Sequence, residues 1–209
     1  MTIKLAVVLL GAVCIGGPLL QTLRFRRFAA RSPWQVPLGF SREGIGWLLV
    51  AVALGLLIGM GGLIVAGHPI ADRIPGFGVP DPVRLAGLAV GAAGAVFAFH
   101  SQSAMGASWR VGTDEASERE LVTGGIYSRI RNPIYLGLLI QMIGAAILVA
   151  NAGALAALIA GTAGLHQIIT SEERFLIQKY GQAYADYMAR TGRLLPRMGG
   201  RASEGKGSA

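Results

Sequence analysis

Charged side chains are scarce in this chain. Of its 209 residues, 14% are Asp, Glu, Lys or Arg and 53% are hydrophobic, whereas a soluble domain usually carries about 25% charged residues. The charges gather in short stretches, and long apolar runs rich in Gly and Ala lie between them. This distribution is expected where a lipid bilayer is the solvent for most of the chain. The sequence therefore predicts a polytopic integral membrane protein.

Several other features that would point to a different class are also missing. The one cysteine, Cys14, lies in the first apolar run, so the chain has no disulfide framework. The net charge is +8, but Lys and Arg form no stripe with interleaved aromatics, so no nucleic-acid partner is expected. His100 and His166 show no metal-ligand spacing with the acids, and no metal site is predicted. The N-terminal region carries a single Lys4 and no small-x-small cleavage site, so an uncleaved helix is expected there.

Five apolar stretches reach or approach the roughly 20 residues that a helix needs to cross the hydrocarbon. They are Ile3–Leu23, Gly44–Gly67, Val83–Met105, Pro133–Ala150 and Ala152–Ile169. Only Asn151-Ala152-Gly153 separates the last two, which predicts a tight helical hairpin. Gly recurs in most of these stretches, and small residues allow helices in lipid to approach closely. The predicted fold is all-α and integral to the membrane, with five transmembrane helices and a cytosolic amphipathic C-terminal helix.

The distribution of Lys and Arg predicts the orientation, because cytoplasmic loops carry the excess of positive charge. Five crossings place the N-terminus outside and the C-terminus in the cytoplasm, with only Lys4, Arg73 and Arg84 on the outer side. The cytosolic segments then carry Arg24, Arg26, Arg27, Arg31, Arg42, Arg110, Arg119, Arg129, Arg131, Arg174, Lys179, Arg190, Arg193, Arg197, Arg201 and Lys206.

The chain divides by pattern into three regions. Residues 1–82 are a two-span membrane region, 83–198 a functional core, and 199–209 a Gly/Ser-rich charged tail that is expected to be disordered. The outer loop Pro69–Pro82 is short and punctuated by Pro and Gly, so it is interpreted as a plain connector.

The loop before the fourth predicted span contains several residues typical of a ligand-binding site. Gly124-Gly125 suits a close approach of the backbone to a ligand. Asn132-Pro133 is a favourable helix start, so the amides and dipole of that helix, beside Arg131, predict an anion site at the cytosolic surface. The alternative is that Tyr127 and Arg131 are ordinary interfacial anchors. The same loop also carries four acids, namely Asp114, Glu115, Glu118 and Glu120.

A second polar block follows the fifth predicted span. Leu176, Tyr180, Tyr184 and Tyr187 fall on one helical face, which predicts an amphipathic interfacial helix interrupted near Gly181; the alternative is a belt of aromatic anchors. Glu172 and Glu173 would lie at the end of the fifth span, where a negative dipole terminus disfavours them, so partners are expected. His166 lies one and a half turns before Glu172, which leaves a polar lining role open to it.

The two blocks together resemble a known family. LVTGGIYSRIRNPIYLG, followed after a helical hairpin by EERFLIQKYGQAYADYMARTGRLLP, is similar to the isoprenylcysteine carboxyl methyltransferases. These belong to a wider group of membrane methyltransferases that includes phospholipid N-methyltransferases. The resemblance covers about Met105 to Pro196, nearly half of the chain, and implies S-adenosyl-L-methionine as the methyl donor, bound on the cytosolic side.

Particular residues match the family's cofactor-binding segments. Asn132 departs from the family's commoner His, which bears on the acceptor rather than on the cofactor. By charge, Arg131 suits the carboxylate of the cofactor, and Glu172 or Glu173 suits its ammonium or ribose hydroxyls. Arg131 and Glu173 are therefore the candidate catalytic residues. The predicted cofactor-binding set is Gly125, Ile126, Tyr127, Arg131, Asn132, Pro133, Tyr135, His166, Glu172 and Glu173, with Tyr180, Gly181 and Tyr184 matching the closing helix.

The predicted activity is methyl transfer from S-adenosyl-L-methionine to a lipid-like or prenylated acceptor that enters from the membrane. Three alternatives stay open. One is a phospholipid amine N-methyltransferase, and another is an NADPH-dependent sterol-type reductase on a related scaffold. The third is a non-catalytic membrane protein with the same fold, against which the retained acids and the Tyr127–Arg131 pair argue. The acceptor and the oligomeric state are not specified by the sequence.

Overall fold

A computed structural model describes residues 2–28, 41–106 and 121–197. Within them the fold is all-helical, as predicted. The predicted tail 199–209 and the loop acids Asp114, Glu115, Glu118 and Glu120 lie outside the described residues. The helices are α1 (Ile3–Phe28), α2 (Arg42–Ala66), α3 (Pro69–Arg73), α4 (Asp81–Met105), the short 3-10 helix η2 (Gly125–Ser128), α5 (Pro133–Val149), α6 (Ala152–Tyr180) and α7 (Gln182–Arg190).

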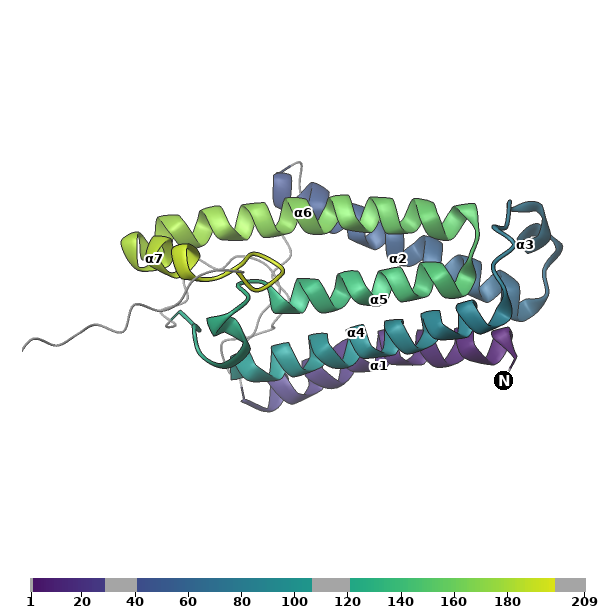
Figure 1. The fold of residues 1–209 in the computed structure, drawn as a ribbon, viewed down its shortest axis with the longest axis horizontal. Coiled ribbons are helices and arrows are strands. Elements are labelled where there is room, and N and C mark those ends of the chain that lie inside the picture. The colour runs from purple at the N-terminus through teal and green to yellow at the C-terminus, as the bar shows by residue number, and fades with distance from the viewer. Residues whose placement is uncertain (1, 29–40, 107–120, 198–209) are drawn as a thin grey trace, which may run out of the picture.

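The five long helices lie side by side along the longest axis of the molecule (Figure 1). Helix α4 packs mainly on α5 and α2 mainly on α6, while α1 covers α4. One end of the bundle, which we call the α7 end, holds η2, the start of α5 and α7. The opposite end, the α3 end, holds α3, the α5–α6 hairpin and the N-terminus (Figure 1).

Three of the helices, α2, α4 and α6, are long and apolar enough to cross a membrane. The described apolar part of α1, Ile3–Cys14, and all of α5 are shorter. The chain is therefore a multi-pass membrane protein with three long candidate spans among its described residues, and the count of five stays a prediction.

Glycines form the contact between α4 and α5, as the recurring small residues predicted. A Cβ added to Gly94 would lie 2.7 Å from the carbonyl oxygen of Gly137, and one added to Gly137 would lie 2.8 Å from Cα of Ala98. A Cβ added to Gly144 would meet the backbone of Gly91. Only glycine fits where two helix backbones come this close, so these residues set the separation of the two helices.

The predicted hairpin between α5 and α6 is present. Ala150 adopts a left-handed conformation (φ 53°) after the last turn of α5, and the side chain of Asn151 accepts a hydrogen bond from Ala154 N and so caps α6. The outer loop is more than the plain connector that we expected. Its Phe77 N donates to Ala150 O, and its Pro75 O accepts from Ala152 N, so the loop is tied to the hairpin.

Helix α6 does not end near Ile169, where the apolar stretch ends. It continues unbroken to Tyr180, 29 residues in all. The prediction that Glu172 and Glu173 lie at a helix end is therefore wrong, because both lie inside the last third of α6. The chain turns only at Gly181, whose φ of 53° suits glycine, and α7 follows.

Candidate active site

The Gly-Gly segment lies open at the α7 end. Gly125 begins η2 with φ +60°, a conformation that favours glycine, and no described residue lies within 4 Å of a Cβ added to Gly124 or Gly125. Ile126 is half-buried, and Tyr127 is buried with its hydroxyl donating to Ser101 O of α4 (3.0 Å). The segment is thus anchored through Tyr127 and leaves an accessible backbone surface at the two glycines.

The chain after η2 pairs with the chain after α7. Gly192 N donates to Arg129 O (3.0 Å), Arg131 N donates to Gly192 O (2.8 Å), and Asn132 N donates to Arg193 O (3.1 Å). These backbone bonds hold two segments side by side that lie some sixty positions apart in the sequence. They bring Arg131, Asn132 and Arg193 to one place, facing α6.

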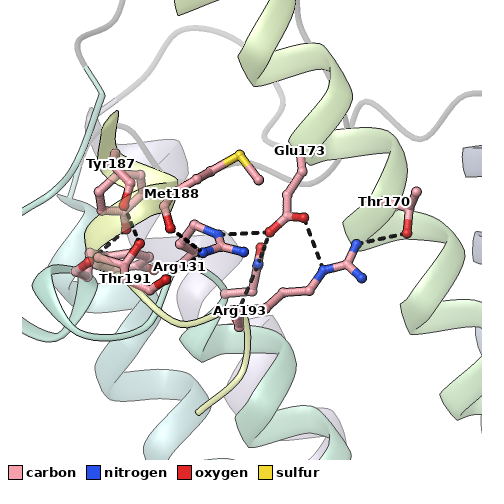
Figure 2. A network of polar contacts seen from close by, with 9 residues as sticks. Arg131, Thr170, Glu173, Tyr187, Met188, Thr191 and Arg193 are labelled. Atoms are coloured by element: carbon pink, nitrogen blue, oxygen red, sulfur yellow. Dashed lines mark hydrogen bonds and ion pairs between the residues drawn. The ribbon is translucent and has the colours of Figure 1, made fainter. Parts of the chain in front are cut away.

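Glu173 lies at the centre of this arrangement (Figure 2). It is 7% exposed. Its Oε1 accepts from Nε of Arg131 and from Nδ2 of Asn132, both at 3.0 Å, and its Oε2 lies 3.0 Å from Nε of Arg193. The Arg193 contact is an ion pair without hydrogen-bond alignment. A carboxylate this deeply buried needs such compensation, because desolvation of an uncompensated charge costs several kcal/mol.

Arg131 is largely engaged within the protein. In addition to its bond to Glu173, its Nη1 donates to Met188 O (3.1 Å) and to Thr191 O (2.6 Å), as Figure 2 shows. Its Nη2 makes no hydrogen bond or ion pair with the part of the chain that the structure describes. Arg131 therefore joins α5, α6 and α7, and one guanidinium nitrogen is left to meet a ligand.

Asn132 precedes α5 as predicted, but it does not cap the helix with its side chain. Its amide nitrogen donates to Glu173 Oε1 and to Arg193 O instead. Asn132 is 8% exposed, and Pro133 follows it, buried, at the first position of the helix. The buried carboxylate offers a stronger, charge-assisted bond than the helix amides do, which explains the difference.

A second group of polar side chains adjoins the first. The hydroxyl of Tyr135, on the first turn of α5, donates to Oε1 of Glu172 (2.6 Å). Glu43 is 6% exposed on the first turn of α2 and is close enough to Tyr135 to act on its hydroxyl electrostatically. Sequence reasoning missed Glu43, since an acid in the first turn of a helix is commonly explained by the helix dipole alone.

Tyr184 and Tyr187 are buried, so the aromatic belt that we considered is wrong for them. Both lie on α7, which follows the interruption that we predicted near Gly181. The Tyr187 hydroxyl donates to Tyr127 O (2.7 Å) and so joins α7 to η2. Burial raises the pKa of Tyr187 to about 12, although Arg131 and Arg190 oppose the rise. Burial also raises the pKa values of Tyr127 and Tyr184, above that of Tyr187.

The structure does not bring every predicted residue to the site. His166 is exposed on α6, and its side chain makes no hydrogen bond or ion pair with described residues. Two residues that we had not assigned to the site do belong to this network. Arg193 had been counted only as a topological charge, although it lies within the second motif, and Thr191 offers its backbone oxygen to Arg131. The described residues contain no cluster of three or more metal-binding side chains.

Comparison with known proteins gives the activity. No curated protein matches the chain. Residues 83–183, however, match the family model described as phospholipid methyltransferase. The matched region runs from α4 to the start of α7 and includes Arg131 and Glu173, while Glu43 and Arg193 lie outside it. The match favours a methyltransferase over the nicotinamide-dependent reductase that the sequence left open. The protein is a membrane methyltransferase that uses S-adenosyl-L-methionine.

Proposed function

We propose that the acceptor is the amine of a phospholipid headgroup, methylated at the α7 end of the bundle. The family description supports a lipid acceptor. The observation that carries the choice of an amine is the negative charge beside Tyr135, where Glu172 accepts a bond from the hydroxyl and Glu43 is close enough to act on it electrostatically. An ammonium headgroup is attracted to such a pair, whereas the carboxylate of a prenylated cysteine is repelled by it.

The residues at this end fit the cofactor's chemistry. The open backbone at Gly124 and Gly125 admits a ligand. Nη2 of Arg131 is the nitrogen that suits the cofactor carboxylate. Glu173 is already bonded to two arginines, so we assign it the role of positioning Arg131 and Asn132 rather than direct contact with the cofactor.

Bound S-adenosyl-L-methionine supplies an electrophilic methyl group. The chain's own contribution is mainly to position and to deprotonate the acceptor. An amine headgroup is protonated at neutral pH and must lose one proton before its nitrogen can attack. The carboxylate of Glu172 accepts that proton, and the Tyr135 hydroxyl fixes its orientation through the 2.6 Å bond. Glu43 adds negative charge nearby and so favours the approach of the ammonium.

The test is methyl transfer by the purified protein in mixed micelles of phosphatidylethanolamine. We expect a base-stable N-methyl product, and we expect Glu172→Gln and Glu43→Gln each to lower kcat/KM by about ten- to a hundredfold. Asp186→Asn is the matched control, because Asp186 is an exposed carboxylate on α7 that bonds Gln182 and no other described residue. The activity of this variant should equal that of the wild type. A base-labile methyl ester, formed on an added prenylcysteine in place of the N-methyl lipid, would reject the amine acceptor.

We also propose that the chain crosses the membrane five times, with the α7 end in the cytosol. Helix α5 is 17 residues long, about 26 Å at 1.5 Å per residue, which is close to the roughly 30 Å of hydrocarbon. The arginine bias supports the orientation. In a Cys14→Ala background, thiol labelling of Ala189→Cys and Arg73→Cys should report opposite sides of the membrane. Labelling of both from one side contradicts the topology.

A further inference from the structure

A pocket of about 420 Å³ lies at the α3 end, the opposite end from the active site. It is formed where the outer loop is tied to the α5–α6 hairpin by the bonds of Phe77 and Ala152. The ends of all three long apolar helices meet there, since α2 ends at Ala66, α4 begins at Asp81 and α6 begins at Ala152. The pocket therefore opens at the level of one membrane surface.

The pocket wall carries charge of both signs. Lys4, Arg84 and Asp72 all line it. The Lys4 ammonium lies beside Gly67 at the end of α2, 3.3 Å from the point that a Cβ on Gly67 would occupy. His68 also lines the pocket, and its Nδ1 accepts a bond from Ile70 N (3.3 Å). A neutral His68 consequently carries its proton on Nε2, which makes this nitrogen a hydrogen-bond donor.

The rest of the wall is largely apolar, with Ile64, Phe77 and Val149 among its residues. Phe77 is 52% exposed. Arg84 is less available than the other charges, because its Nε donates to Leu148 O (2.9 Å) and its Nη2 to Val149 O (3.3 Å) at the end of α5. Lys4, His68 and Asp72 are thus the polar groups best placed to meet a ligand.

We propose that this pocket binds the headgroup of a zwitterionic phospholipid, one whose phosphate carries an amine, at the membrane surface opposite to the active site. Lys4 and the Nε2–H of His68 suit the phosphate, and Asp72 suits the ammonium. The apolar wall suits the glycerol backbone and the first acyl carbons, which a soluble phosphate compound lacks. A purely anionic headgroup meets the repulsion of Asp72. This site is independent of the acceptor site at the α7 end.

The test is native mass spectrometry of the detergent-purified protein with equal amounts of dioleoyl phosphatidylethanolamine, dioleoyl phosphatidylglycerol and dioleoylglycerol. The wild-type protein should retain phosphatidylethanolamine in preference to the other two lipids. Lys4→Met should lose one bound phosphatidylethanolamine and weaken its retention about tenfold, the effect of one charge-assisted bond. Asp72→Asn should shift the preference toward phosphatidylglycerol.

Arg73→Ala is the matched control, since Arg73 lies beside Asp72 on the short helix α3 but does not line the pocket. Its lipid retention should equal that of the wild type. S-adenosylhomocysteine binding should be unchanged in Lys4→Met, which separates this site from the acceptor site and verifies folding. Equal retention of phosphatidylethanolamine by Lys4→Met and the wild type overturns the site. If the wild type retains phosphatidylglycerol as well as it retains phosphatidylethanolamine, the zwitterionic specificity is wrong. If equimolar soluble phosphoethanolamine fully displaces the bound phosphatidylethanolamine, the ligand is not a lipid.

Discussion

The two ends of the bundle use charge in different ways. At the α7 end, Arg131 and Arg193 meet the buried carboxylate of Glu173, so positive and negative charge satisfy one another inside the protein. At the α3 end, Arg84 bonds the last carbonyl groups of α5, while Lys4 and Asp72 stay exposed on the wall of a pocket. The first arrangement positions a site by internal pairing, whereas the second leaves its charges to a ligand.

The largest difference between the ends should appear in stability. Glu173→Ala leaves Arg131 and Arg193 without their carboxylate and should lower the free energy of unfolding by about 3–5 kcal/mol, as expected when one partner of a buried pair is removed. Asp72→Asn removes an exposed carboxylate and should have little effect. Thermal unfolding in detergent measures both variants. Similar melting temperatures for the two would show that Glu173 does not hold the α7 end together.

Cofactor affinity should distinguish two neighbouring arginines at the α7 end. Arg131→Lys keeps the positive charge but loses the planar guanidinium that serves Glu173 and two carbonyl groups together. We expect S-adenosylhomocysteine binding to weaken by about ten- to a hundredfold, corresponding to roughly 1.5–3 kcal/mol. Arg129→Ala, an exposed residue two positions earlier, should change it little. Calorimetry that finds the two variants equal would move the cofactor site away from Arg131.

The contact between α4 and α5, which runs between the two ends, should lose stability when a single methyl group is added. Gly144→Ala places a Cβ against the backbone of Gly91, and overpacking of this kind costs about 1–3 kcal/mol. Gly55→Ala on α2 is the control, because no residue in the described part of the chain lies within 4 Å of its added Cβ. Thermal unfolding should separate the two variants, and a Gly144→Ala protein as stable as Gly55→Ala would mean that α4 and α5 are not in close contact.

The smallest expected effect is on the free energy of unfolding at alkaline pH, to which Tyr187 contributes. Tyr187→Phe removes the bond to Tyr127 O and should cost about 1 kcal/mol. The folded pKa of about 12 exceeds the ordinary value of 10, so the unfolded chain releases this proton first, and the stability is lost as pH rises from about 10 to 12. Unfolding midpoints measured across that range should fall less steeply for Tyr187→Phe. An unchanged slope would mean that Tyr187 does not stay protonated in the fold.

Periodicity and composition were enough to predict the helices, the hairpin at Asn151 and the glycine contacts, because these depend on local pattern and on bilayer thickness. The end of α6 was not predictable in this way. Hydropathy falls after Ile169, yet the helix continues to Tyr180, since Glu173 finds two arginines from elsewhere in the chain. A hydropathy pattern reports where the lipid ends and not where the helix ends.

Most residues of the candidate site could be named from the sequence, whereas the contacts among them could not be predicted. The expectation that the two acids have partners is confirmed for both, with Glu173 paired to Arg131 and Arg193 and Glu172 bonded by Tyr135. The pairing that turns Arg131 inward depends on backbone contacts with Gly192 and Arg193, which join distant segments. Glu43 belongs to a helix outside the matched family region, and no local signal distinguishes it from an ordinary helix-start acid.

The unbroken length of α6 has a consequence for where the reaction takes place. From Ala152 to Glu173 there are 21 residue steps, which at 1.5 Å each amount to about 32 Å, close to the roughly 30 Å thickness of the hydrocarbon. If the first turn of α6 lies at one membrane surface, the helix is long enough to place Glu172 and Glu173 at the depth of the opposite headgroups. In the function that we propose, the lipid acceptor therefore needs no extraction into water, and a thinner or thicker bilayer would shift Glu172 away from the depth of the headgroups.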